Sequence, residues 1–269
     1  MIGRLLTLAA AISSSAAPAQ TAPKQPTGKW TVDFADHECI LARPYGRTTK
    51  DTLILAFKKL PMEAGIGVYV FKYGGKRSMN DRKAELDFGG GKPVESGFSA
   101  FPLESGLRMI ALGVEDGAYN AAVRSGLVHV GVPREMSETF AVPGLGPALK
   151  VLDQCALSLG EIWGIPKDQQ LRVATPAKWI NREGLFSSND YPAAALKNDA
   201  SGKTVLRLMV DEAGKPSDCI ILKPSGERSL DSRSCGIMTR RAQFEPARDI
   251  AGKPMRSVSV TTINWLLFN

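Results

Sequence analysis

The chain has 269 residues, of which 43% are hydrophobic and 23% charged, and its formal net charge is +7. This length suffices for two modest domains that each bury a core, and the composition is typical of a globular protein. The positive excess is spread along the chain, because residues 186–269 hold 12 basic and 9 acidic side chains and residues 20–185 hold 21 and 18. Without a basic stripe, the charge indicates a solvated surface and argues against nucleic-acid binding.

Residues 1–19 have the layout of a secretory signal peptide. Arg4 precedes an apolar run over residues 5–12, and residues 17–19 form an Ala-x-Ala cleavage site. The apolar run is shorter than the roughly 20 residues that a membrane-spanning helix needs. We therefore expect a cleaved signal peptide and a periplasmic protein, with an uncleaved membrane anchor as the alternative. Residues 20–29, rich in Pro, Thr and Lys, are expected to be a tether.

Export bears on the four cysteines, because an even number of cysteines in an oxidising compartment usually forms disulfides. Four cysteines allow three pairings. Cys39 and Cys155 bracket the N-terminal region, and Cys219 and Cys235 lie together in the C-terminal one. We predict pairing within each region, with four free buried thiols as the alternative.

Residues 30–165 are predicted to form a β-rich domain, a sandwich or barrel-like arrangement of antiparallel strands that ends in a helix. The predicted strands are apolar or alternating segments at residues 30–34, 52–57, 65–71, 107–112 and 127–132. Glycine clusters near residues 74 and 90 separate some of them as turns. A helix is predicted to start at Pro147, because apolar residues follow at helical spacing, and to end at Trp163 and Gly164.

A polar linker is expected over residues 166–185, with a short helical piece near residues 176–180. Residues 186–269 are predicted to form a small antiparallel sheet with a packed helix, so that the whole chain is α+β. The expected elements are a helix over residues 193–197, strands over 203–211 and 217–223, a helix that begins near residue 229, and a long final strand over 255–268.

No set of residues for catalysis or metal binding can be assembled from the sequence. His37 begins a His-x-Cys pair that no second pair completes, and His129 lies in the middle of a predicted strand. No serine stands in a Gly-x-Ser-x-Gly elbow. The Gly-Lys-Thr at residues 202–204 lacks the earlier glycine of a phosphate-binding loop and precedes a strand. We predict a binding protein and not an enzyme, without catalytic residues, metal or cofactor.

The order and spacing of short motifs in residues 186–269 resemble the C-terminal domain of the TonB family. The motifs are Tyr191-Pro192, the turn at Gly202, residues 210–214, Ser225-Gly226, Leu230-Asp231, Phe244 with Pro246-Ala247, and residues 252–254. Cys219 and Cys235 resemble the subgroup in which a disulfide joins the second strand to the following helix. TonB itself also has a membrane helix and a proline-rich rod, and a folded domain stands in the place of the rod here.

The resemblance implies a module that captures an extended segment from the plug of an outer-membrane receptor. The segment would add as a strand to an exposed sheet edge, and the function would belong to transport across the outer membrane. Carried over by position, the partner-binding residues are Ser188, Asn189, Asp190, Val258, Val260 and Thr262.

Two alternatives remain open at this stage. The chain could be a periplasmic structural or assembly factor of the envelope whose last strand docks or forms a homodimer, because exposed strand edges are usually covered. Separately, Lys223, Arg228 and Arg240-Arg241 form a basic cluster. That cluster suits an acidic partner or lipopolysaccharide phosphates, or is simply a solvated helix face.

Overall fold

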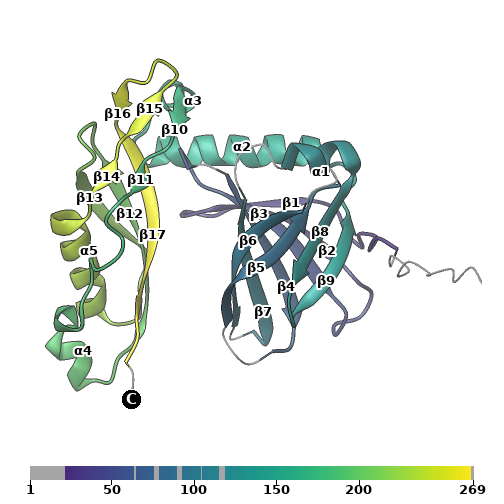
Figure 1. Cartoon of the computed structure of the whole chain (residues 1–269), viewed down its shortest axis with the longest axis horizontal. Helices are drawn as coiled ribbons and strands as arrows, with labels where there is room; N and C mark the ends of the chain where they lie inside the picture. Colours follow the sequence, from purple (N-terminus) through teal and green to yellow (C-terminus); the bar gives the residue numbers. More distant parts are fainter. Residues whose placement is uncertain are drawn as a thin grey trace, which may run out of the picture.

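The structure is a computed structural model that describes residues 22–63, 65–75, 79–89, 93–103, 105–114 and 119–267. The expected signal peptide and the last residue of the expected final strand lie outside these ranges. Figure 1 shows a curled N-terminal sheet and a smaller C-terminal sheet, with a long helix running across the top of the first toward the second. The α+β prediction, with a β-rich N-terminal domain that ends in a helix, is confirmed.

The N-terminal domain is one antiparallel sheet that curls around its core. Its strands are β1 (Thr31–Phe34), β2 (Cys39–Tyr45), β3 (Leu53–Lys59), β4 (Ile66–Tyr73), β5 (Met79–Asp87), β6 (Val94–Pro102), β7 (Leu107–Val114), β8 (Leu127–Val132) and β9 (Met136–Ala141). They follow the order β1-β2-β3-β4-β7-β6-β5-β8-β9. A short helix, α1 (Tyr119–Ser125), precedes β8.

The segment expected to be a tether lies against this sheet from Ala22 onward. Lys24 forms a parallel bridge with Phe140 in β9, and Pro26 forms an antiparallel bridge with Tyr45 in β2. Both backbone groups of Lys24 are used, since its N–H donates to Thr139 (2.7 Å) and its carbonyl accepts from Ala141 (2.9 Å). The segment therefore joins the two sides of the curled sheet.

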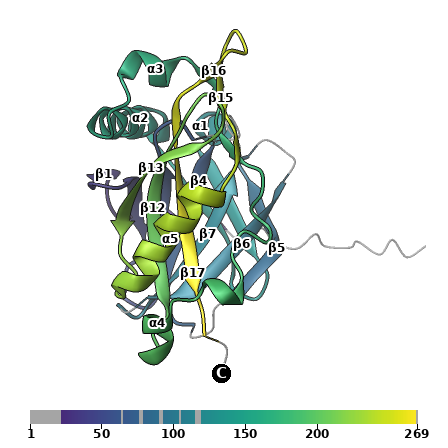
Figure 2. The same cartoon turned by 90° about the vertical axis from the view of Figure 1, so that its left-hand side faces the viewer.

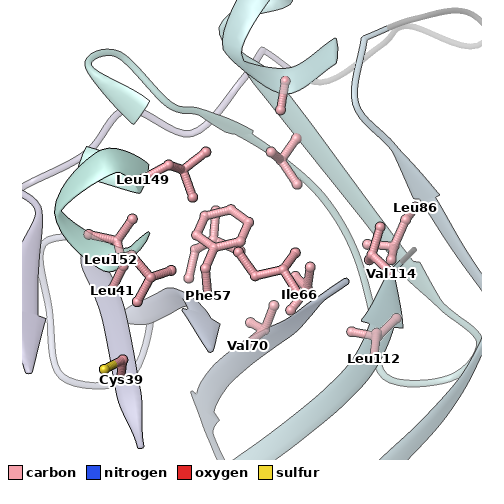
Figure 3. Packing of buried hydrophobic residues seen from close by; sticks show 14 of the residues in the cluster. Cys39, Leu41, Phe57, Ile66, Val70, Leu86, Leu112, Val114, Leu149 and Leu152 are labelled. Carbon is pink, nitrogen blue, oxygen red and sulfur yellow. The ribbon is translucent and has the colours of Figure 1, made fainter. Parts of the chain in front are cut away.

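The core of the N-terminal domain follows from strand alternation, which places every second side chain on the inner face. Phe57, Leu41 and Val70 are fully buried there, as Figure 3 shows. Helix α2 (Leu145–Ile162) packs Leu149 and Leu152 onto this core. The predicted disulfide between Cys39 and Cys155 is confirmed, and it fastens α2 to β2.

The region between the two domains is more ordered than a polar linker. It contains α3 (Lys167–Leu171), β10 (Val173–Thr175) and β11 (Lys178–Trp179). The expected helical piece near residues 176–180 is wrong, because β10 pairs with β15 (Ala247–Asp249) and β11 with β14 (Phe244–Glu245). Partners about 65–75 residues away in sequence decide this structure, and local propensity is a weak guide in such a case.

The C-terminal domain contains the predicted small sheet and its helix. Its further elements are the 3-10 turn η1 (Ser188–Asp190), α4 (Ala193–Lys197), β12 (Gly202–Val210), β13 (Pro216–Lys223), α5 (Arg228–Arg241), β16 (Pro254–Met255) and β17 (Ser257–Trp265). The main sheet has the order β13-β12-β17, and both pairings are antiparallel. The second predicted disulfide, between Cys219 and Cys235, joins β13 to α5.

Both faces of this sheet are covered. Leu206, Leu208 and Ile263 face the cluster that includes buried residues of α5. Met209 and Val258, on the opposite face, belong to the hydrophobic cluster of the N-terminal domain. Figures 1 and 2 agree that α5 lies on the side away from the N-terminal domain, so the sheet is the middle layer between them.

Candidate functional site

Strand β17 is an edge of the C-terminal sheet. It pairs with β12 on one side, and no strand in the described part of the chain pairs with its other side. The N–H of Val260 points away from β12, because it donates to Oε1 of Glu63 at 3.1 Å. Backbone groups alternate in direction along an antiparallel strand, so those of Val258, Val260 and Thr262 all face this open edge.

The side chains of the same three residues lie on the face of the sheet turned toward the N-terminal domain. Val258 is 2% exposed, whereas Val260 is half-buried and Thr262 is exposed. They are opposite Met209, Arg207 and Val205 of β12. The predicted residues of the last strand thus share one edge, with more exposed side chains toward the C-terminal end.

A groove of about 580 Å³ lies between the N-terminal domain and the strands β12, β13 and β17 of the C-terminal sheet, and we call it the edge groove. The C-terminal side contributes Val205, Leu222, Lys223, Ser259, Val260, Thr261, Thr262 and Asn264. The N-terminal side contributes His37, Glu38, Lys58, Leu60, Glu63, Gly65, Ile66, Gly67, Tyr69, Gly113 and Val114. Trp179 and Arg182 of the connecting region complete the lining.

The N-terminal wall contains an ion pair and two partly buried polar side chains. Lys58 forms an ion pair with Glu38. Burial raises the pKa of the Glu63 carboxyl, while the hydrogen bond from Val260 and the charge of Lys58 act in the opposite direction. Burial also raises the pKa of the Tyr69 hydroxyl. The wall therefore offers a carboxylate in a partly desolvated position directly at the strand edge.

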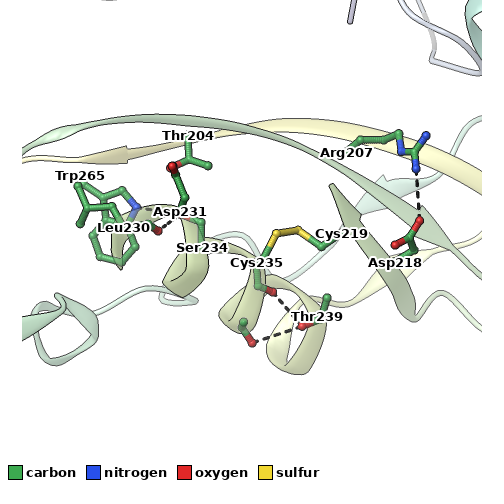
Figure 4. The surroundings of a disulfide bond; sticks show 11 residues. Thr204, Arg207, Asp218, Cys219, Leu230, Asp231, Ser234, Cys235, Thr239 and Trp265 are labelled. Carbon is green, nitrogen blue, oxygen red and sulfur yellow. Dashed lines mark hydrogen bonds and ion pairs between the residues drawn. A yellow bond between two sulfur atoms is a disulfide. The ribbon is translucent and has the colours of Figure 1, made fainter. Parts of the chain in front are cut away.

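Helix α5 holds the opposite face of the sheet, as Figure 4 shows. The hydroxyl of Thr204 in β12 donates to Asp231 of α5 at 2.7 Å. The indole N–H of Trp265, at the end of β17, donates to the hydroxyl of Ser234 at 2.8 Å. With the disulfide between Cys219 and Cys235, each strand of the sheet has a specific bond to α5, so β17 is presented on a fixed support.

The structure places Ser188, Asn189 and Asp190 in the turn η1, on the α5 side of the sheet. Asp190 is 2% exposed, and its carboxylate accepts from Arg233 at 2.8 Å and from Arg241 at 2.9 Å. Its carboxylate also accepts from the N–H and the hydroxyl of Ser187, both at 3.0 Å. The bond from Arg241 is the largest of the influences that hold the pKa of Asp190 at about 2.

Asp190 therefore faces α5, while Val258, Val260 and Thr262 face the N-terminal domain. It lines a separate hollow beside α5, together with residues that include Ser232, Arg233 and Arg240. The two groups of predicted partner-binding residues thus lie on different faces of the sheet.

The predicted basic cluster is divided in the same way. Lys223 lines the edge groove, whereas Arg240 lines the hollow beside α5 and Arg241 is paired with Asp190. Lys223 therefore lies apart from Arg240 and Arg241.

The two histidines lie at separate places in the N-terminal domain. Nδ1 of His129 lies 2.9 Å from the hydroxyl of Thr139 across the β8–β9 pair, and His37 lies at the edge groove. Within the described ranges, no three His, Cys, Asp or Glu side chains gather where they could hold a metal ion. Over the same ranges, no helix combines the length and the apolar character needed to span a membrane.

The C-terminal sheet has two edge strands, β13 and β17, and is supported by a helix and a disulfide. An exposed sheet edge can accept an added strand. Residues 187–267 match the family model described as Gram-negative bacterial TonB protein C-terminal. The resemblance inferred from the motifs after Tyr191 is confirmed, and this part of the chain is a TonB C-terminal domain. None of the curated proteins searched matches the chain. At the level of the family, the domain is a module of protein interaction that engages receptors in the cell envelope.

Reasoning from the sequence missed the N-terminal half of the site. Glu63 stands in the loop between β3 and β4, next to Met62, whose φ of 57° is unusual for a residue other than glycine. No local pattern connects Glu63 with Val260, since 197 residues separate them. Only the docking of the two domains brings them together.

Proposed function

We propose that this protein is an exported, periplasmic binding protein whose β17 edge captures an extended segment of an outer-membrane receptor plug. The open edge at Val258, Val260 and Thr262 is the observation that carries the proposal. Its outward N–H and C=O groups can pair with an added strand, whose main-chain hydrogen bonds supply affinity while side-chain pockets supply selectivity.

The edge suits this role because it is accessible and yet protected. Long, flat, exposed strand edges promote aggregation. Strand β17 instead lies in the edge groove, where the side chain of Glu63 accepts a hydrogen bond from the N–H of Val260. Thr262 is exposed and leaves the C-terminal half of the edge open to an incoming chain. A segment of four to six residues would extend about 13–20 Å along the strand, enough to span the three outward-facing residues.

Photo-crosslinking in the native cells tests the proposal. A photo-reactive residue replaces Thr262, and the adduct is identified by mass spectrometry. The matched control carries the same residue at Ile220, which is 43% exposed and lies on β13 at the opposite edge of the sheet. We expect a peptide from a receptor plug at Thr262 and none at Ile220.

A self-adduct at Thr262 would instead favour the alternative function, an envelope structural or assembly factor that forms a homodimer through its last strand. Equal capture of the same plug peptide at both positions would also contradict the proposed site, since it would show that the partner does not distinguish β17 from β13.

A further inference from the structure

The N-terminal domain forms a full wall of the edge groove. This wall consists of the segment just before β2, the end of β3, the loop that follows β3, and the neighbouring strands β4 and β7. The domains are joined tightly here, because Met209 and Val258 of the C-terminal sheet belong to the hydrophobic cluster of the N-terminal domain. Any strand that added to this edge of β17 would therefore lie against residues outside the TonB C-terminal domain.

Glu63 occupies the position that a main-chain carbonyl of an added strand would take. Its Oε1 accepts the outward N–H of Val260 at 3.1 Å, a normal length for a bond between a backbone amide and an oxygen. In an antiparallel or parallel ladder that N–H donates to a carbonyl oxygen of the neighbouring strand. A partner strand can therefore satisfy Val260 only after the Glu63 side chain has moved.

One of two paired glycines on the opposite wall leaves space for the partner. Gly113 of β7 and Gly67 of β4 are paired neighbours in the N-terminal sheet, and both line the edge groove. A Cβ atom added at Gly113 would meet no atom within 4 Å. At Gly67 the ring of Tyr69 fills this space, because its Cε2 would lie 2.6 Å from an added Cβ, so of these two positions Gly113 is the open one.

We propose that the N-terminal domain is part of the strand-binding site: the partner segment lies in the edge groove between β17 and β4, and one of its carbonyl oxygens replaces Glu63 on Val260. This inference rests on the proposed function and extends it, because it assigns to the N-terminal domain a share in the affinity for an extended peptide. Glu63 competes with the peptide for one hydrogen bond, and Gly113 leaves room for it.

Peptides of seven residues, selected from a random display library against the full exported chain, serve as the probe. Their dissociation constants are measured for the unmodified chain and for three variants. Glu63→Ala removes the competing acceptor, whereas Glu63→Gln keeps an oxygen that can accept from Val260. Gly113→Phe fills the groove from the N-terminal wall, and Gly131→Phe, on β8, is its control because an added Cβ there meets its nearest atom at 3.4 Å.

We expect Glu63→Ala to bind the peptides about 3- to 10-fold more tightly, as the release of one competing hydrogen bond implies. Glu63→Gln should stay near the unmodified chain. Gly113→Phe should weaken binding at least tenfold, while Gly131→Phe leaves it unchanged. Unfolding curves in urea establish that each variant is folded.

A further variant separates failure of this inference from failure of the proposed function. Thr262→Pro removes one outward donor, and proline is tolerated in an edge strand where the N–H faces away from the sheet. If Thr262→Pro abolishes binding while Glu63→Ala and Gly113→Phe leave it unchanged, the strand adds to β17 without the N-terminal domain, and only this inference is overturned. If Thr262→Pro has no effect on peptide binding, the β17 edge is not the binding site, and both this inference and the proposed function are overturned.

Discussion

Asp190 offers a sharp test of how the C-terminal domain is held together. The resemblance to the TonB family implied a role in partner binding for this residue, yet its carboxylate is bonded to Arg233, Arg241 and Ser187. Replacing Asp190 with Asn preserves its shape and removes its charge. We expect Asp190→Asn to lower the free energy of unfolding and to leave the β17 edge intact.

The magnitude follows from the pKa of Asp190, which is about 2 against an ordinary value of 3.8. Each unit of difference corresponds to about 1.4 kcal/mol of stabilisation in the charged state. The side chains of Arg233 and Arg241 are 35% and 47% exposed, so water screens both ion pairs. We therefore expect a loss of about 1–2 kcal/mol at neutral pH.

The stabilisation by the Asp190 charge depends on pH. Because the folded pKa is lowered, the stabilisation is fully present above about pH 4 and is lost as the pH falls through about 2. The assay is urea unfolding followed by tryptophan fluorescence, in which a loss of this size shifts the midpoint by about 0.5–1 M. The difference between the two proteins should be largest at pH 7 and shrink between pH 4 and pH 2.

Asp36→Asn is the matched control, since Asp36 is exposed just before β2 and forms no ion pair with the described residues. The stabilising role of the Asp190 charge is refuted if Asp190→Asn unfolds at the same urea concentration as the unmodified chain at pH 7. It is also refuted if the difference between them stays constant down to pH 2.

Three further changes test other parts of the account. Replacing both Cys219 and Cys235 with Ala opens a loop of about 15 residues and should cost about 3 kcal/mol, measured by urea unfolding under oxidising conditions; an unchanged midpoint would show that the disulfide is dispensable. Trp265→Ala should cost about 3–5 kcal/mol, because it removes a buried ring and its bond to Ser234; a loss below about 1 kcal/mol would contradict this packing. A chain that begins at Gly28 lacks the bridging segment, so its β9 amides should exchange faster with solvent while those of β12 do not.

Much of the C-terminal domain could be predicted from the sequence because its signals are local. Alternating residues define β12, and the helix α4 was predicted with the bounds that the structure gives. Export, an even number of cysteines and the location of Cys219 and Cys235 in one region predicted their pairing, which the structure confirms. The family resemblance added the position of the open edge, which no pattern of hydrophobic residues could have supplied.

Other features depend on contacts between distant segments, and for this reason the sequence did not reveal them. Residues 176–180 were expected to be helical, but Trp179 lies in β11 opposite Phe244 of β14. Arg207, which strand alternation places on the face of β12 opposite Leu206 and Leu208, is 6% exposed because the N-terminal domain covers that face. The bridge from Lys24 to Phe140 spans most of the N-terminal domain in sequence.

Arg207 lies at the interface between the domains, and its hydrogen bonds there are incomplete. Its guanidinium donates to Asp218 at 3.3 Å and to the carbonyl of Trp163 at 3.5 Å, and it lies 5.5 Å from the centre of the Trp163 ring. Its Nε is buried without a hydrogen-bond partner among the described residues. Buried polar groups of this kind cost stability, so the two domains are held by their shared apolar cluster more than by this cation.

Amide hydrogen exchange of the full chain, resolved by residue, with and without a selected peptide, tests the central claim most directly. If a strand adds to β17 in the edge groove, the outward amides of Val258 and Thr262 become protected when the peptide binds. Val260 should change less, because the peptide replaces a bond that Glu63 already supplies. Protection confined to β13, or to the hollow beside α5, would contradict the account.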